Sequence, residues 1–251
     1  SSFSKCVRLL VHTPKDINTL KDLELVKNVT LFPHGIFDYD SKKASTNNVL
    51  KRFRDKEYRL STFGFCLPNK GFINLVKAIE IVHKAGFKVS LNIYTSLYDS
   101  SISYEYHDKL SNAINDSIIS DFVTLNTLYI EDEYQLLNEL SDSDLIVYPY
   151  EYSNESSSAS VRHGLATSNP VVITKSSIFD DVRKCAYTLP GYTSDLMAQG
   201  IIDFLEKELF DKYSTSDLIL SWKKAHKFTK LGRRLLGMIK GIEVNDRSNI
   251  G

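Results

Sequence analysis

The sequence predicts an α/β fold in which a mostly parallel sheet carries helices on both faces and a helical tail closes the chain. Short β-like runs alternate with segments of helical periodicity, which is the pattern of successive βαβ units. From Thr193 to about Glu243 the pattern changes, and one helical segment follows another without a convincing strand. No run reaches the roughly 18 apolar residues of a membrane span, which excludes an integral membrane protein.

The expected elements can be placed in chain order. Helical spacing is clearest at 71–84, where apolar residues recur at i, i+3, i+4, i+7 and i+10 from Phe72 onward. Two further helices, with weaker patterns, are expected at 131–140 and 156–166. Strands are expected at 7–12, 28–32, 58–65, 87–94, 122–125, 145–148 and 171–174.

The chain divides into two unequal parts. Residues 1–36 are expected to end a preceding unit and to include the linker that leaves it, and residues 37–251 to form one α/β domain with its closing helices. The polar, irregular stretch 42–55 separates the first βαβ segment from the main series. The sequence starts with Ser1 and no apolar signal segment follows, so we expect a piece of a longer protein.

Charge and cysteine content exclude several classes of protein. Thirty-one basic residues balance 31 acidic ones, whereas a general nucleic-acid-binding domain usually has a basic excess, so no nucleic-acid partner is expected. Cys6, Cys66 and Cys185 are odd in number and far apart, so they predict neither a disulfide framework nor a zinc site. We therefore expect a reducing, cytoplasmic location.

The first candidate site is the loop that follows the strand at 58–65. It contains glycine and proline and ends in Lys70-Gly71, where an amphipathic helix opens. A helix N-terminus with free backbone N–H groups beside an ammonium can hold a phosphate. The glycine spacing is neither that of a Walker A loop nor G-x-G-x-x-G, and taken alone the pattern favours an ordinary βα turn with a surface lysine.

The second candidate site follows the buried-type strand at 145–148. Glu155 and several hydroxyl residues lie in a polar loop that leads into a helix. Ligands of open α/β sheets bind in such a crevice at the carboxyl ends of the strands. A carboxylate there can hold sugar hydroxyls while helix N–H groups hold phosphate. The alternative is that Glu155 and the serines only cap the helix.

Both loops occur together and in this order, and the chain resembles the C-terminal, nucleotide-sugar-binding half of a known enzyme family. This family is the GT-B fold glycosyltransferases of family 4, the retaining glycosyl transferases group 1. The resemblance implies a Rossmann-like sheet. It runs through the chain and rests on the order of five segments rather than on any one motif. These segments are 28–36, 64–71, 129–150, 155–172 and 222–240.

The resemblance assigns roles to residues of both loops. Lys70, in the Gly-x-x-x-x-x-Lys-Gly loop that runs from Gly64 to Gly71, would contact the donor diphosphate. Glu155 would bind hydroxyls of the donor sugar, and Lys70 and Glu155 would be the catalytic pair. Backbone N–H groups would meet the phosphates at three positions, which are Ser157, Ser158 and Ala159.

Two positions depart from the family pattern. Phe65 stands where the family usually has a phosphate-binding Arg, and Arg162 could replace part of that charge. His163 stands where the second signature glutamate would be, and it can offer a ribose hydroxyl one hydrogen bond but no carboxylate.

The function implied is transfer of a hexose, such as mannose, glucose or N-acetylhexosamine, from a UDP- or GDP-linked donor with retention of configuration. The acceptor would be a glycan or a lipid-linked glycan in polysaccharide assembly. The acceptor site would come from the N-terminal GT-B domain, so this chain alone is expected to be inactive. The departures at Phe65 and His163 keep open a non-catalytic nucleotide-sugar-binding or protein-interaction module. A sugar-nucleotide epimerase is a further alternative, although its acid-base residues are not apparent.

No metal site and no cofactor are expected, because such GT-B enzymes generally need no bound metal. Two Asp-x-Asp triplets occur. The one at Asp142 and Asp144 is explained as the end of a helix, and the one at Asp38 and Asp40 as interdomain loop.

The tail from Trp222 to Lys240 is basic and amphipathic, with seven Lys or Arg and no acidic residue. This pattern is typical of a helix lying on an anionic membrane, which would place a peripheral contact at the inner face. A helix packed on the domain with a solvated basic face gives the same pattern.

Overall fold

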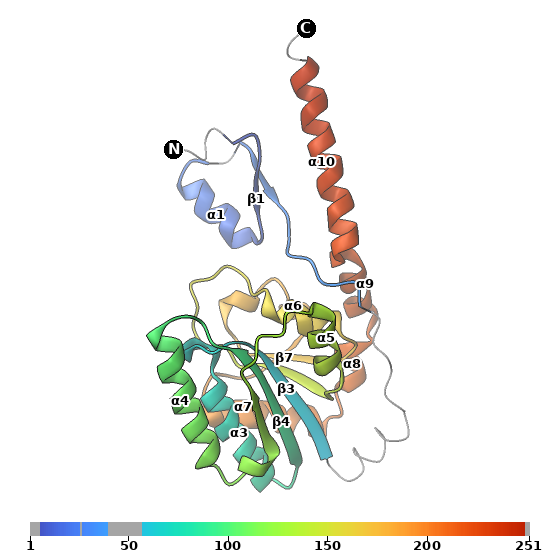
Figure 1. The fold of residues 1–251 in the computed structure, drawn as a ribbon. Helices are drawn as coiled ribbons and strands as arrows, with labels where there is room; N and C mark the ends of the chain where they lie inside the picture. Colours follow the sequence, from blue (N-terminus) through green and yellow to red (C-terminus); the bar gives the residue numbers. More distant parts are fainter. Residues whose placement is uncertain (1–5, 26, 40–56, 249–251) are drawn as a thin grey trace.

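The computed structural model describes residues 6–25, 27–39 and 57–248. Its main body is a six-stranded parallel sheet in the order β5-β4-β3-β6-β7-β8, with helices on both faces (Figure 1). The fold class expected from the sequence is confirmed. The strands are β3 (Glu57–Phe65), β4 (Lys88–Ser96), β5 (Val123–Asn126), β6 (Leu145–Tyr148), β7 (Val171–Ile173) and β8 (Tyr187–Thr188).

The sheet is buried on both sides, and β6 shows this directly. Leu145 and Val147 pack into the hydrophobic core on one face, whereas Ile146 and Tyr148 pack into the core on the other. A strand that is covered on both faces needs an uninterrupted apolar run, which is why this strand lacks the polar alternation of an exposed sheet.

Helices α3 (Phe72–Lys84), α4 (Ser101–Asn115) and α7 (Ser194–Glu206) contribute to one core, and α5 (Glu133–Ser141) and α6 (Ser160–Ala166) to the other. Helix α3 buries the apolar stripe that begins at Phe72, as its spacing predicts.

The N-terminal segment forms a unit of its own. Strands β1 (Leu9–Val11) and β2 (Val29–Leu31) pair in parallel around α1 (Pro14–Asp22), in a sheet separate from the main one. Thr13 and Asp16 form a capping box at the start of α1. The domain boundary after residue 36 stays a prediction, and the stretch 42–55 lies outside the described residues.

The tail is helical, with α8 (Phe210–Ser214), α9 (Asp217–His226) and α10 (Phe228–Ser248). The linker joins the α9–α10 junction, since the Ile36 N–H donates to the His226 carbonyl at 2.8 Å and the Phe228 N–H donates to the Ile36 carbonyl at 2.9 Å. Helix α10 then projects beside the β1–α1–β2 unit (Figure 1). Within the described residues, no helix combines the length and apolar character needed to cross a membrane.

Candidate functional site: the edge where the strand order reverses

The strand order places both candidate loops at one edge of the sheet. Strand β3 is central, the chain moves outward through β4 and β5, and it then returns to the other side of β3 as β6, β7 and β8. The point of reversal therefore lies between β3 and β6. Ligands of open α/β sheets bind at such a switch point, beyond the carboxyl ends of the strands.

Lys70 is a buried cation at this edge. It ends a short 3₁₀ turn after β3 and is only 6% exposed. Its Nζ lies 4.1 Å from the centre of the Tyr150 ring, and it forms no ion pair with any described residue. Burial lowers the pKa of the Lys70 ammonium below its ordinary value, and the nearby Glu155 carboxylate opposes this shift. A buried ammonium held over a ring face and without a paired carboxylate is suited to receiving an anion.

Two glycines of the predicted site are required by close packing. Gly71 has φ of +69°, and a Cβ there would lie 2.1 Å from the carbonyl oxygen of Pro149. A Cβ at Gly64 would lie 2.3 Å from Oη of Tyr150. The hydroxyl of Tyr150 donates to the carbonyl of Phe63 at 2.8 Å, which locks the ring beneath Lys70. The glycines therefore let the two loops approach closely enough to bury the lysine.

The second loop offers unused hydrogen-bonding groups. Helix α6 begins at Ser160, four residues later than the sequence predicts, so Ser157 and Ser158 lie in the loop. Within the described residues, the backbone N–H groups of Ser157, Ser158 and Ala159 have no hydrogen-bond acceptor. The Ser157 hydroxyl is also buried without a partner in this part of the chain. Glu155 is exposed and caps no helix. Unpaired backbone N–H groups and a hydroxyl can donate hydrogen bonds to the oxygen atoms of an anion.

His163 borders a cavity of about 170 Å³ between the ends of β3, β4 and β5 and the starts of α5 and α6. Its Nε2 lies 2.6 Å from Oε2 of Glu133, and its ring packs against Phe37 and Phe63 at 5.3 and 5.0 Å between ring centres. Phe65 lines the same cavity and is 46% exposed. The cavity is therefore lined mainly by aromatic and aliphatic side chains, with one carboxylate–imidazole pair at its wall.

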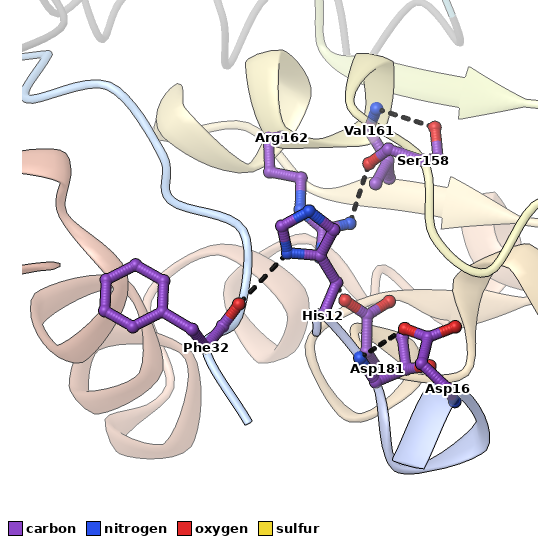
Figure 2. Close-up of polar contacts among 8 residues, drawn as sticks. His12, Asp16, Phe32, Ser158, Val161, Arg162 and Asp181 are labelled. Carbon is purple, nitrogen blue, oxygen red and sulfur yellow. Dashed lines mark hydrogen bonds and ion pairs between the residues drawn. The ribbon is translucent and has the colours of Figure 1, made fainter. Parts of the chain in front are cut away.

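Arg162 has partners other than those expected. It is 3% exposed, forms an ion pair with Asp181 and donates from Nη1 to the carbonyl of Ser158 at 2.7 Å. Figure 2 shows the bond to Ser158 together with His12 and Asp181. Asp181 already neutralises the charge of Arg162, so Arg162 is less suited than an unpaired cation to binding the phosphate that the sequence resemblance assigns to it.

The N-terminal unit brings two histidines close to this edge. His12 and His34 stack with ring centres 3.6 Å apart, and Nδ1 of His12 lies 3.0 Å from the carbonyl of Phe32. Burial, then the charges of His12 and Arg162, lower the pKa of His34 to about 4. The two rings therefore pack against each other, which is consistent with a structural role for both histidines.

The described residues contain no cluster of three or more His, Cys, Asp or Glu that could hold a metal ion. Asp144 accepts a hydrogen bond from the backbone N–H of Arg59 at 2.8 Å, and Asp142 caps the C-terminus of α5, as the helix-end interpretation predicts. Asp38 accepts hydrogen bonds from Thr229, and Asp40 lies outside the described residues.

Comparison with known structures identifies the fold as that of GT-B glycosyltransferases. The chain is similar to a UDP-forming α,α-trehalose-phosphate synthase from Burkholderia vietnamiensis (TM-score 0.76, 10% identity, 97% of this chain and 62% of that one). It is similar to sucrose-phosphate synthase from Thermosynechococcus elongatus (TM-score 0.75, 14% identity, 97% and 60%). It is also similar to Anabaena HepE in complex with UDP and glucose (TM-score 0.73, 13% identity, 94% and 64%). The chain thus spans about three fifths of each of these structures. No family model matches the sequence, and no curated protein matches it.

Two residues at this edge of the sheet, Tyr150 and Glu133, are not predicted from the sequence. Tyr150 lies two residues after the buried strand β6, and a tyrosine in that position is a signal for a packed ring. Glu133 gives no such signal, because an acidic residue in the first turn of a helix is commonplace.

Proposed function

We propose that this chain is the donor-binding half of a retaining glycosyltransferase that uses a UDP- or GDP-linked hexose. The observation that carries this proposal is the buried Lys70 ammonium, which lies without an ion pair among the described residues. In the loop before α6, the Ser157 hydroxyl and the backbone N–H groups of Ser158 and Ala159 have no partner among the described residues. They can donate hydrogen bonds to the same anion.

In this proposal the diphosphate binds between Lys70 and the Ser157–Ala159 loop. Lys70 neutralises the charge that develops on the departing diphosphate, and the low-dielectric setting strengthens that interaction. Glu155, which lies close enough to influence the pKa of Lys70, accepts hydrogen bonds from hydroxyls of the sugar and orients it. Catalysis then rests on positioning and electrostatics and needs no metal.

Titration calorimetry with UDP and GDP tests the donor site. We expect one of them to bind, and Lys70→Ala to weaken that binding by about 1.5–3 kcal/mol, because a hydrogen bond to a charged group is lost. Lys77→Ala is the matched control, since Lys77 is an exposed lysine on the helix that follows. Glu155→Ala should weaken the sugar nucleotide more than the free diphosphate. If neither nucleotide binds, the non-catalytic interaction module becomes the better explanation.

We further propose that an N-terminal GT-B domain supplies the acceptor site. The β1–α1–β2 unit supports this, because it forms its own small sheet and is joined to α10 by a hydrogen bond from Arg234 to the carbonyl of Leu31. The 251-residue chain alone should then bind donor without transferring sugar to a glycan or lipid-linked acceptor. Robust sugar transfer by this chain alone would contradict the proposal that the acceptor site lies in an N-terminal domain.

We propose that the basic tail, residues 222–240, binds anionic lipid headgroups at the inner face of a membrane. Leu231 packs inward, but Phe228, Leu236 and Ile239 on α10 stay about half exposed beside the basic residues. Co-sedimentation with vesicles should rise with the fraction of anionic lipid and fall with salt. Binding that does not depend on the anionic lipid fraction would contradict membrane contact. The basic residues would then be explained as the solvated face of a helix.

A further inference from the structure

The cavity beside the proposed diphosphate site has a simple chemical composition. Its walls are mostly aromatic and aliphatic, from Phe63, Tyr94, Ile130 and Leu136 among others. Among the described residues that line it, Glu133 is the one carboxylate. Such a wall accepts a flat ring by stacking, and the carboxylate accepts hydrogen bonds from hydroxyl groups.

The cavity is continuous with both candidate loops. Gly64 and Phe65 line it at the start of the loop that carries Lys70, and Ala159 and Ser160 line it at the end of the loop that carries Ser157. Gly64 packs against Tyr150, whose ring lies under Lys70, so the cavity begins beside the proposed anion site. This geometry selects a molecule with a phosphate at one end and a ring with hydroxyls beyond it.

Glu133 is held in place rather than left free. The Nε2–H of His163 donates to Oε2 of Glu133 at 2.6 Å, and the His163 ring is itself held between Phe37 and Phe63. Glu133 also lies in the first turn of α5, where the helix dipole stabilises a carboxylate. The Glu133 side chain is 47% exposed, whereas that of His163 is 12% exposed. Oε1 of Glu133 accepts no hydrogen bond within the described part of the chain, so it remains available to a ligand.

We infer that Glu133, positioned by His163, binds the ribose hydroxyls of the nucleotide and makes the site selective for ribonucleotides. This inference rests on the proposed donor site and adds a specificity residue to it. The carboxylate that binds the ribose comes from α5. His163, on α6, positions this carboxylate and does not itself take the place of a carboxylate on α6. Two vicinal hydroxyls are donors that one carboxylate can accept together.

Calorimetry with UDP and with its 2′,3′-dideoxy analogue, and with the corresponding GDP pair, tests this inference. In the unmodified chain, the ribonucleotide should bind about ten-fold or more tightly than the dideoxy form, because hydrogen bonds to a charged acceptor are lost. Glu133→Ala should bring that ratio close to one, because only the ribonucleotide loses hydrogen bonds to the carboxylate. Glu131→Ala, an exposed carboxylate two residues upstream that does not line the cavity, should keep the ratio of the unmodified chain.

Variants of His163 separate positioning from mere packing. His163→Ala should lower the ratio, and His163→Gln should restore it, since the glutamine amide can donate to Glu133. The pair Glu133→Ala with His163→Glu, which returns a carboxylate from the α6 side, should also recover discrimination.

The outcomes distinguish this inference from the proposal beneath it. If no nucleoside diphosphate binds, both are overturned. If UDP or GDP binds and depends on Lys70, but shows no preference over its dideoxy form, only the ribose inference is overturned. The same holds if Glu133→Ala keeps the preference.

Discussion

Replacing Gly71 with alanine should destabilise the protein by about 2 to 5 kcal/mol. Gly71 has φ of +69°, and the left-handed backbone alone costs an L-residue roughly 1–2 kcal/mol. The added Cβ would lie 2.1 Å from the Pro149 carbonyl oxygen, which belongs to the backbone and cannot rotate away. Shifting the chain that follows β6 to relieve this overlap adds about 1–3 kcal/mol.

Gly86 provides the matched control. It also has a positive φ, of +92°, but a Cβ there would meet no heavy atom within 4 Å. Gly86→Ala should therefore lose only the backbone share, about 1–2 kcal/mol. The difference between the two variants measures the close approach of the Gly71 loop to Pro149.

Urea unfolding measures the stability loss of both variants, from the shift of the unfolding midpoint at a common m-value. Calorimetry with UDP or GDP adds a second measurement, because Lys70 directly precedes Gly71. We expect Gly71→Ala to weaken nucleotide binding and Gly86→Ala to leave it unchanged. Equal losses of stability in the two variants would refute the reasoning, since they would show that the contact with Pro149 carries no cost.

Three further predictions concern groups that support the site. The contribution of neutral His34 to the free energy of unfolding should be complete above about pH 6.5, the ordinary pKa of histidine. It should decrease as the pH falls toward 4. The pKa of His34 is about 4 in the folded chain, so the unfolded state binds more protons in this window; His34→Asn should flatten the curve of unfolding midpoint against pH. Tyr150→Phe should cost about 1–2 kcal/mol in urea unfolding, because the partly buried carbonyl of Phe63 loses its hydrogen bond from the Tyr150 hydroxyl; no change would show that water replaces the hydroxyl. Arg162→Met should cost about 3–5 kcal/mol by leaving Asp181 unpaired, and adding Asp181→Leu should recover much of the loss; a double variant no more stable than the single one would contradict the pairing.

The periodicity of the sequence determined the fold class and most element positions. The strand expected at 58–65 is observed at Glu57–Phe65, and the helix expected at 71–84 at Phe72–Lys84. These elements are long and strongly patterned, and their burial follows directly from where apolar residues recur. Helix α4, by contrast, was not singled out, and β8 was missed, since two residues carry no periodicity.

The start of α6 shows where local reasoning failed. A helix was expected from residue 156, but it begins at Ser160. The run of serines before it is a weak helix former, because serine hydroxyls compete for nearby backbone groups. The Ser158 hydroxyl does accept a hydrogen bond from the Val161 N–H, at 3.4 Å, whereas the Ser157 hydroxyl has no partner within the described residues.

The sequence by itself determined the α/β architecture, the two loops that follow β3 and β6, and the residues Lys70 and Glu155 as candidates. Only the tertiary structure decided which partners their neighbours take. It buried Lys70 over the ring of Tyr150, committed Arg162 to Asp181, and brought Glu133 of α5 to His163 of α6. The physical reason is that these pairs join residues 19 to 80 positions apart, and such contacts are set by strand order and close packing, which periodicity does not encode.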